Sequence, residues 1–219
     1  MVRSTLGRLQ QDVLAGFFRR ESRFFLTGGG ALAGFHLGHR ETSDLDLFAT
    51  SDILEDGAAA LAETARELGA AAESIRTAPD FRRLLLRRGS DSVVVDLVRE
   101  RAEQAFPDKP LVGGVRVDPP GEILANKLCT LLSRAEIRDL VDVRALEGAG
   151  YPVDEALAPA ARKDAGLTPA QLSWVLSQIT IGEDAQPPGG VSAAELRRYL
   201  EDLVARLARL AYPGSKAKA

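Results

Sequence analysis

The chain has 219 residues, 45% of them hydrophobic and 27% charged, with a formal net charge of −3 at pH 7. This composition is that of a folded globular protein, and the net charge excludes nucleic-acid binding driven by bulk charge alone. The single cysteine, Cys129, excludes an internal disulfide and fits a reducing cytoplasm. No apolar stretch reaches the roughly 18 residues of a membrane span, so we expect a soluble cytoplasmic protein.

The first part of the chain alternates between helical and strand-like patterns. Apolar residues recur at helical spacing over residues 6–19, which predicts a helix. A short apolar run at 24–27 ends in three glycines and predicts a buried strand, and a helix is expected over 31–37. The alternation of polar and apolar residues over 44–50 predicts another strand.

A further helix and several strands are expected next. Asp52 and Glu55 have the spacing of a capping box, so this helix should begin there and end near Gly69. Residues 112–117 predict one more strand, or a hairpin at their paired glycines. Between the end of this helix and residue 112, three strand-like segments are separated by turn residues, at 73–77, 81–87 and 92–98.

The pattern becomes helical in the last hundred or so residues. The chain is therefore predicted to contain an α/β domain at 1–118 and a helical domain at 119–219. Residues 216–219 are expected to be a frayed tail. Two helices are expected at 122–132 and 137–146. A third should begin at the capping box of Thr168 and Gln171, with Pro169 as its first helical residue, and a fourth at the capping box of Ser192 and Glu195.

Two aspartates, Asp44 and Asp46, are two positions apart on a predicted strand. Side chains at this spacing point to the same face, where adjacent carboxylates repel unless a cation neutralises them. The pair therefore suits a hard cation such as magnesium, which prefers oxygen ligands. The alternative is two solvated aspartates on an exposed strand face.

Three glycines, Gly28, Gly29 and Gly30, stand between a predicted strand and a predicted helix. Glycines at this position let backbone amides approach a phosphate group near the positive end of the helix. The alternative is a tight turn without a ligand. The segment is neither a Walker loop nor a complete dinucleotide-binding fingerprint.

A third carboxylate, Asp96, interrupts the strongly apolar segment 93–98. A charge in such a strand is costly unless it is paired, hydrogen-bonded or metal-bound. Asp96 is therefore either the edge of a site or a salt-bridge partner in the core.

Together and in this order, these motifs resemble the DNA polymerase β-like nucleotidyltransferase superfamily. The closer resemblance is to the AbiEii/AbiGii toxin family, which includes MenT-type toxins, and it spans about residues 24–147. One departure is Gly30, which stands where the family usually has serine or threonine. The segments that carry the resemblance are 26–32, 40–48, 122–128 and 138–143.

The resemblance implies an α+β fold in which a mixed β-sheet flanked by helices is followed by a C-terminal helical region. It also implies a metal-dependent transfer of a nucleotidyl group from a nucleoside triphosphate to an acceptor. The metal would be Mg²⁺ or Mn²⁺, held by Asp44, Asp46 and Asp96, and Asp96 could also help to deprotonate the acceptor hydroxyl. A toxin role would bring an antitoxin as partner.

Other residues acquire expected roles from the same resemblance. Lys127 would neutralise triphosphate charge, and Asp139 would orient Lys127 or act as a base. Arg40 would contact phosphate or brace the site, although a structural salt bridge is equally compatible. The alternatives for Lys127 and Asp139 are an ordinary surface lysine and an ordinary helix-surface aspartate.

Some polar residues are expected to stay outside the chemistry. His36 and His39 lack partners at metal-ligand spacing, so we expect neither to be catalytic. Asp142 lies one helical turn after Arg138 and is expected to pair with it.

The acceptor is less clearly indicated, with tRNA or another RNA as one option. The alternatives are a protein or small-molecule acceptor, and a nucleotide-binding interaction module without turnover. Two groups of arginines could form a basic track for RNA or could be solvated residues offset by nearby acids: Arg82, Arg83, Arg87 and Arg88, and Arg197, Arg198, Arg206 and Arg209.

Overall fold

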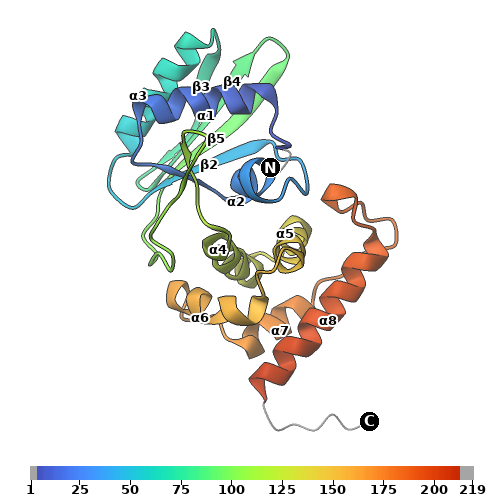
Figure 1. The fold of residues 1–219 in the computed structure, drawn as a ribbon. Coiled ribbons are helices and arrows are strands. Elements are labelled where there is room, and N and C mark those ends of the chain that lie inside the picture. Colours follow the sequence, from blue (N-terminus) through green and yellow to red (C-terminus); the bar gives the residue numbers. More distant parts are fainter. Residues whose placement is uncertain (1–3, 213–219) are drawn as a thin grey trace. The chain divides into compact units, whose positions relative to one another are not determined.

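The computed structural model describes residues 4–212 (Figure 1). The chain divides into two compact units. The first takes the described residues of Met1–Ala102 and Phe106–Pro119, and the second takes Glu103–Ala105 and the described residues of Pro120–Ala219. The main division thus falls after residue 119, whereas the sequence pattern predicts a boundary after residue 118. The tail expected at 216–219 lies outside the described residues.

The first unit is built on a five-stranded mixed sheet with the strand order β1-β2-β5-β4-β3. The central pair, β2 and β5, is parallel, and the other neighbouring pairs are antiparallel. Strands are confirmed at all five of the segments expected to join this sheet, with small shifts of their ends. Their bounds are β1 Phe25–Thr27, β2 Asp44–Ala49, β3 Ala71–Ala78, β4 Phe81–Arg88 and β5 Asp91–Arg99.

Two helices, α1 (Arg8–Arg20) and α3 (Leu54–Glu67), cover one face of the sheet (Figure 1). The apolar side chains of β2 that point to this face, Leu45 and Leu47, are fully buried. The intervening residues of β2, Asp44 and Asp46, therefore point to the opposite face. This alternation leaves one face of the sheet for the core and one for polar side chains.

The helix expected after the glycines begins earlier, because the glycines themselves form its first turn. Helix α2 spans Gly28–Ala31 and continues into a single π-helical turn, η1, over Leu32–His36. The segment at 111–116 is a hairpin, with strands β6 (Leu111–Val112) and β7 (Val115–Arg116) joined by the paired glycines. This confirms the hairpin rather than the single strand.

The start of α3 differs from the expectation. The residue at its N-cap is Ile53, whose side chain makes no capping hydrogen bond, so the expected box of Asp52 and Glu55 is not formed. Asp52 instead accepts a hydrogen bond from Arg99 at 2.8 Å. The acidic side chains of Glu55 and Asp56 still lie in the first turn, where they complement the helix dipole.

The second unit consists of helices. Thr168 caps α7 through a hydrogen bond from the Gln171 amide, and Ser192 forms a complete capping box with Glu195 at the start of α8, as expected. Helix α6 was not expected, because its sequence contains Pro159 and small residues in place of a leucine stripe. The bounds are α4 Pro120–Ser133, α5 Ile137–Gly148, α6 Val153–Lys163, α7 Pro169–Ser177, the short 3₁₀ helix η2 Pro188–Gly190, and α8 Ala193–Ala211.

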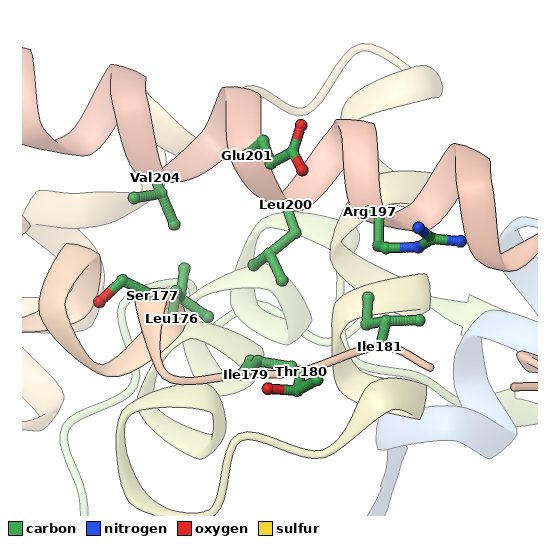
Figure 2. Close-up of a pocket in the computed structure, with 9 residues that line it drawn as sticks. All are labelled: Leu176, Ser177, Ile179, Thr180, Ile181, Arg197, Leu200, Glu201 and Val204. Atoms are coloured by element: carbon green, nitrogen blue, oxygen red, sulfur yellow. The ribbon is translucent and has the colours of Figure 1, made fainter. Parts of the chain in front are cut away.

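Helix α8 packs along α7 through a stripe of leucines. Leu196, Leu200, Leu203 and Leu207 are buried, whereas Leu210 at the end of the stripe is 43% exposed. A cavity of about 380 Å³ lies beside this contact. Figure 2 shows the side chain of Leu200 pointing towards it from α8. None of the residues expected to carry the chemistry lines this cavity. Among residues 4–212, no helix combines the length and the apolar character that crossing a membrane requires.

Candidate active site

The carboxylates of the predicted pair lie on the polar face of the sheet. In the register of the sheet, Asp46 on β2 is directly opposite Thr27 on β1 and Asp96 on β5. Asp44, two residues earlier on β2, lies on the same face of the sheet. Its Oδ1 accepts a hydrogen bond of 2.6 Å from Thr42 Oγ1. The structure therefore brings all three predicted aspartates to one face, at the parallel β2–β5 pair.

The glycine turn lies directly beside Asp46. Gly28 has a φ of +62°, a left-handed conformation that side chains other than glycine rarely adopt. A Cβ atom at this position would lie 2.5 Å from Asp46 Oδ2, which is closer than such contacts ever come. Only glycine lets this carboxylate lie against the start of α2.

Arg40 lies beside Gly29, the next residue of the same turn. A Cβ atom on Gly29 would lie 2.9 Å from Arg40 Nη2 and 3.2 Å from Thr42 Oγ1. Arg40 is 8% exposed and its Nη1 donates a hydrogen bond of 3.0 Å to the carbonyl of Glu41. The guanidinium is thus held beside the first turn of α2, whose amides have no partner within the helix.

Gly30 is oriented differently. A Cβ atom there would lie 3.3 Å from Leu26 Cδ1 and 3.4 Å from Leu45 Cδ2, so a side chain at this position starts against the apolar core. The glycine permits close packing of α2 on the sheet.

Asp96 is engaged by an arginine of the neighbouring strand. Arg83 on β4 donates from Nε to Oδ1 at 2.8 Å and from Nη2 to Oδ2 at 2.6 Å. Asp96 is only 6% exposed, and this bidentate pair neutralises a charge that would otherwise be costly in an apolar strand. Of the two alternatives for Asp96, the structure shows the salt bridge.

This pairing bears on the expected metal centre. Asp44 and Asp46 offer carboxylate oxygens on one face and fit a divalent cation. Asp96 does not fit the expected role of a third ligand, because the guanidinium bound to both its oxygens would repel a cation placed there. Over the part of the chain that the structure describes, no group of three or more His, Cys, Asp or Glu residues is arranged to hold a metal ion.

Lys127 and Asp139 form a buried ion pair within the second unit. Lys127 Nζ lies 2.7 Å from Asp139 Oδ1 and 2.6 Å from Asp142 Oδ2, and both aspartates are fully buried. Arg134 donates from Nε to the other oxygen of Asp139 at 3.0 Å. The expected pairing of Asp142 with Arg138 is wrong, because Asp142 points into the contact of α4 with α5 whereas Arg138 pairs with Glu136.

Lys127 and Asp139 are both buried, so they are not the surface lysine and helix-surface aspartate of the alternative interpretation. That Asp142 shares the lysine was not expected from the sequence. Its position three residues after Asp139 was a usable signal, because residues at that spacing lie on one face of a helix.

Two further buried ion pairs were not expected from the sequence. Lys109 Nζ lies 2.7 Å from Asp118 Oδ1 in the first unit, and Lys163 pairs with Glu122 in the second. No motif singles out these residues, because the two partners of each pair belong to different segments of the chain. His36, which we expected to be non-catalytic, donates a hydrogen bond of 2.7 Å to the carbonyl of Asp118, and burial lowers its pKa.

The arginines of β4 are divided between the two faces of the sheet. Arg82 and Arg88 point to the helix-covered face, where they pair with Glu55 on α3 and Asp12 on α1. On the other face, Arg83 pairs with Asp96, and Arg87 pairs with Glu73. These four side chains are therefore offset by acids and do not form one continuous basic surface. In the second unit, Arg206 is offset in the same way by Glu147.

Comparison with known proteins places the chain within a family. The model of the family described as "Nucleotidyl transferase AbiEii toxin, Type IV TA system" matches residues 12–209, which is most of the chain. This match confirms the resemblance carried by the four motifs. A search among curated proteins gives no match.

Solved structures confirm the fold. JHP933 from Helicobacter pylori superposes with a TM-score of 0.56 at 18% sequence identity, covering 94% of this chain and 93% of that one. The nucleotidyltransferase toxin MenT4 from Mycobacterium tuberculosis H37Rv superposes with a TM-score of 0.51 at 18% identity, covering 91% of this chain and 82% of that one. The expected mixed sheet flanked by helices is thus a nucleotidyltransferase fold.

Proposed function

Because the chain belongs to the AbiEii family of nucleotidyl transferase toxins from type IV toxin–antitoxin systems, we propose a specific reaction for it. The protein is a nucleotidyltransferase, and the reaction moves a nucleotidyl group from a nucleoside triphosphate to a hydroxyl group of an acceptor. It depends on a divalent metal ion, Mg²⁺ or Mn²⁺. An antitoxin encoded with the chain would be its partner.

The observation that carries this proposal is the contact between Asp46 and Gly28. A carboxylate lies against a turn whose glycine tolerates it, and Arg40 lies beside the next glycine of the same turn. A cation at the carboxylates, the amides of the first turn of α2 and the guanidinium of Arg40 would all attract phosphate oxygens. Three kinds of phosphate-binding group therefore converge on one turn.

In the proposed reaction the acceptor hydroxyl oxygen attacks the α-phosphorus of the triphosphate and gives up its proton to solvent. The bond from the α-phosphorus to the oxygen that bridges to the β-phosphate breaks, and pyrophosphate leaves. Asp44 and Asp46 would hold the metal ion, which supplies positive charge for the triphosphate oxygens. The amides of Gly28, Gly29 and Gly30 would bind and orient the phosphates. Arg40 would stabilise the negative charge that moves onto the leaving group.

Lys127 and Asp139 take the roles that their motifs imply. We propose that Lys127 contributes a positive charge for the triphosphate and that Asp139 orients it. The ion pair of 2.7 Å between them supports an orienting role for Asp139. A second hydrogen bond, from Arg134 to the other carboxylate oxygen, also holds Asp139 in place and supports the same role.

The acceptor that we propose is tRNA, whose terminal hydroxyl groups suit a transfer that inactivates an essential molecule. One observation favours a second candidate, a protein or small-molecule acceptor. Each arginine of β4 pairs with an acidic side chain, which weakens the case for an extended RNA-binding surface on that strand.

Labelled nucleoside triphosphates, Mg²⁺ and either total RNA or total protein provide the direct test. We expect label to enter tRNA, and we expect Asp46→Ala to lower the rate by at least about 100-fold, because it removes a metal ligand. The matched control is Asp52→Ala, which removes an exposed aspartate of the same unit and should leave the rate unchanged. Undiminished transfer by Asp46→Ala would exclude the proposed site, and label in protein alone would exclude tRNA.

A further inference from the structure

The face of the sheet that carries the aspartates also carries a fixed cation. In the register of β2, β5 and β4, Asp46 is opposite Asp96, and Asp96 is opposite Arg83. These three side chains point to the same face and form one row across the sheet. The guanidinium of Arg83 therefore lies in the same row as the carboxylates expected to bind metal.

The geometry of the pair ties Arg83 to Asp96 specifically. Two parallel hydrogen bonds, of 2.8 and 2.6 Å, fix the plane of the guanidinium relative to the carboxylate. Asp96 is 6% exposed, whereas the Arg83 side chain is 45% exposed. The arginine thus covers the carboxylate from the solvent side.

Arg83 carries a fixed positive charge. The pKa of its guanidinium is raised above the usual value, chiefly by its hydrogen bonds to Asp96. The arginine therefore stays protonated at any pH at which the protein is folded.

An aromatic ring also helps to hold Arg83 in place. Phe81, two residues earlier on the same face of β4, has its ring centroid 5.5 Å from the Arg83 guanidinium carbon. This contact adds a cation–π attraction to the two hydrogen bonds. Arg83 is therefore held from two directions, and releasing Asp96 to a metal ion would require the guanidinium to leave this position.

We infer that Arg83 supplies the second positive charge of this centre, so that Asp44 and Asp46 hold one divalent cation and Asp96 holds none. This inference rests on the proposed function, because it assumes a metal ion at Asp44 and Asp46. Asp96 is then a positioning residue, which holds Arg83 beside the reacting phosphates. A guanidinium occupies the place that a second metal ion would need.

Counting bound Mn²⁺ in the full chain by the loss of the free-ion EPR signal tests this directly. We expect one ion per wild-type chain and one in Asp96→Asn. Arg83→Ala should bind two ions, because it frees Asp96 for a second one, and the double variant Arg83→Ala/Asp96→Asn should return to one. Arg83→Lys keeps a positive charge at the position and should stay at one.

The matched control is Arg87→Ala, on the same strand and the same face, whose exposed pair with Glu73 should not influence the count of one. Two ions in the wild type, with one lost in Asp96→Asn, would overturn the inference while leaving metal dependence intact. A count of one in folded Arg83→Ala would also overturn it. An absence of bound ions in the wild type would instead contradict the proposed metal centre itself.

Discussion

Gly28 is under two separate constraints at the scale of a single residue. Its φ of +62° costs most other residues about 1–2 kcal/mol, and its missing side chain makes room for Asp46. Gly69, after the end of α3, has a φ of +64°, but a Cβ atom on it would point into open space. Comparing substitutions at Gly28 and Gly69 therefore separates the cost of backbone strain from the cost of disturbing the Asp46 carboxylate.

We expect Gly28→Ala and Gly69→Ala to lose similar free energies of unfolding from the backbone, about 1–2 kcal/mol each. Only Gly28→Ala should lose nucleotidyl transfer, by at least about 100-fold, because its methyl group displaces Asp46. Urea unfolding and the transfer assay measure the two effects. Full activity in Gly28→Ala would show that the position of Asp46 is not critical.

Helices α4 and α5 are joined at the scale of elements by Lys127, which lies between two buried carboxylates. Replacing it by methionine leaves Asp139 and Asp142 buried without their shared cation, which costs about 3–5 kcal/mol. We expect Lys127→Met to lower the free energy of unfolding by this amount, measured in urea. The added substitution Asp142→Asn should recover part of the loss.

The control for that experiment is Arg138→Ala. Arg138 is the residue that helix spacing alone pairs with Asp142, but it is exposed and pairs with Glu136. Its removal should change the free energy of unfolding by less than about 0.5 kcal/mol. A loss as large as that of Lys127→Met would contradict the observed pairing.

Glu147 links α5 to α8 and should make stability depend on pH. It accepts hydrogen bonds from Arg206 at 3.0 and 2.7 Å and from the Tyr199 hydroxyl at 2.6 Å. Burial raises the pKa of Glu147, but these hydrogen bonds outweigh it and the net pKa is lowered. The pKa of Tyr199 is raised, by burial first and then by Glu147.

A carboxyl with a lowered pKa stabilises the fold above its unfolded pKa of about 4.3, and this stabilisation is lost as pH falls through the folded value. Glu147→Gln should therefore be less stable than the wild type at pH 7, by about 1–3 kcal/mol, and this difference should shrink below about pH 4. Urea unfolding at several pH values measures it. A difference that stays constant down to pH 3 would exclude Glu147 as its source.

The elements that the sequence predicted well are those whose pattern is local. The strand over 44–50 and the boxed start of α8 at Ser192 are specified by neighbours a few residues away. Helix α6 was not predicted, because Pro159 and small residues leave no clear helical spacing of large apolar residues in its sequence. Its buried face is defined by its packing against α4.

The sequence named candidate site residues, but it did not name the partners of their side chains. The motifs named Asp96 and Lys127, but the identity of their partners depends on strand order and on helix packing. Arg83 lies opposite Asp96 because β4 pairs with β5, and Asp142 meets Lys127 because α5 packs on α4. The spacing of residues along one segment shows which side chains share a face, but not which partner that face meets.

The charge balance of the whole molecule makes its own prediction. The formal net charge is −3, and all four arginines of β4 are paired with acids. If tRNA is the acceptor, few phosphates can be neutralised, so binding should weaken only gently with salt. We expect a slope of log affinity against log salt no steeper than about −3.

This slope can be measured on Asp46→Ala, which should bind tRNA without modifying it. A slope near about −6 or steeper would reveal a basic surface that the pairing of these arginines does not suggest.

The contact between Gly28 and Asp46 also has an evolutionary consequence. Because one residue exists to accommodate the other, selection should act on them as a pair, although they lie on different elements. In a lineage that loses Asp46, the demand for space at position 28 disappears and only the demand for a positive φ remains. Asparagine, which tolerates that conformation better than most side chains, should then become acceptable at this position. An asparagine there would mark a descendant that has kept the fold and abandoned the chemistry.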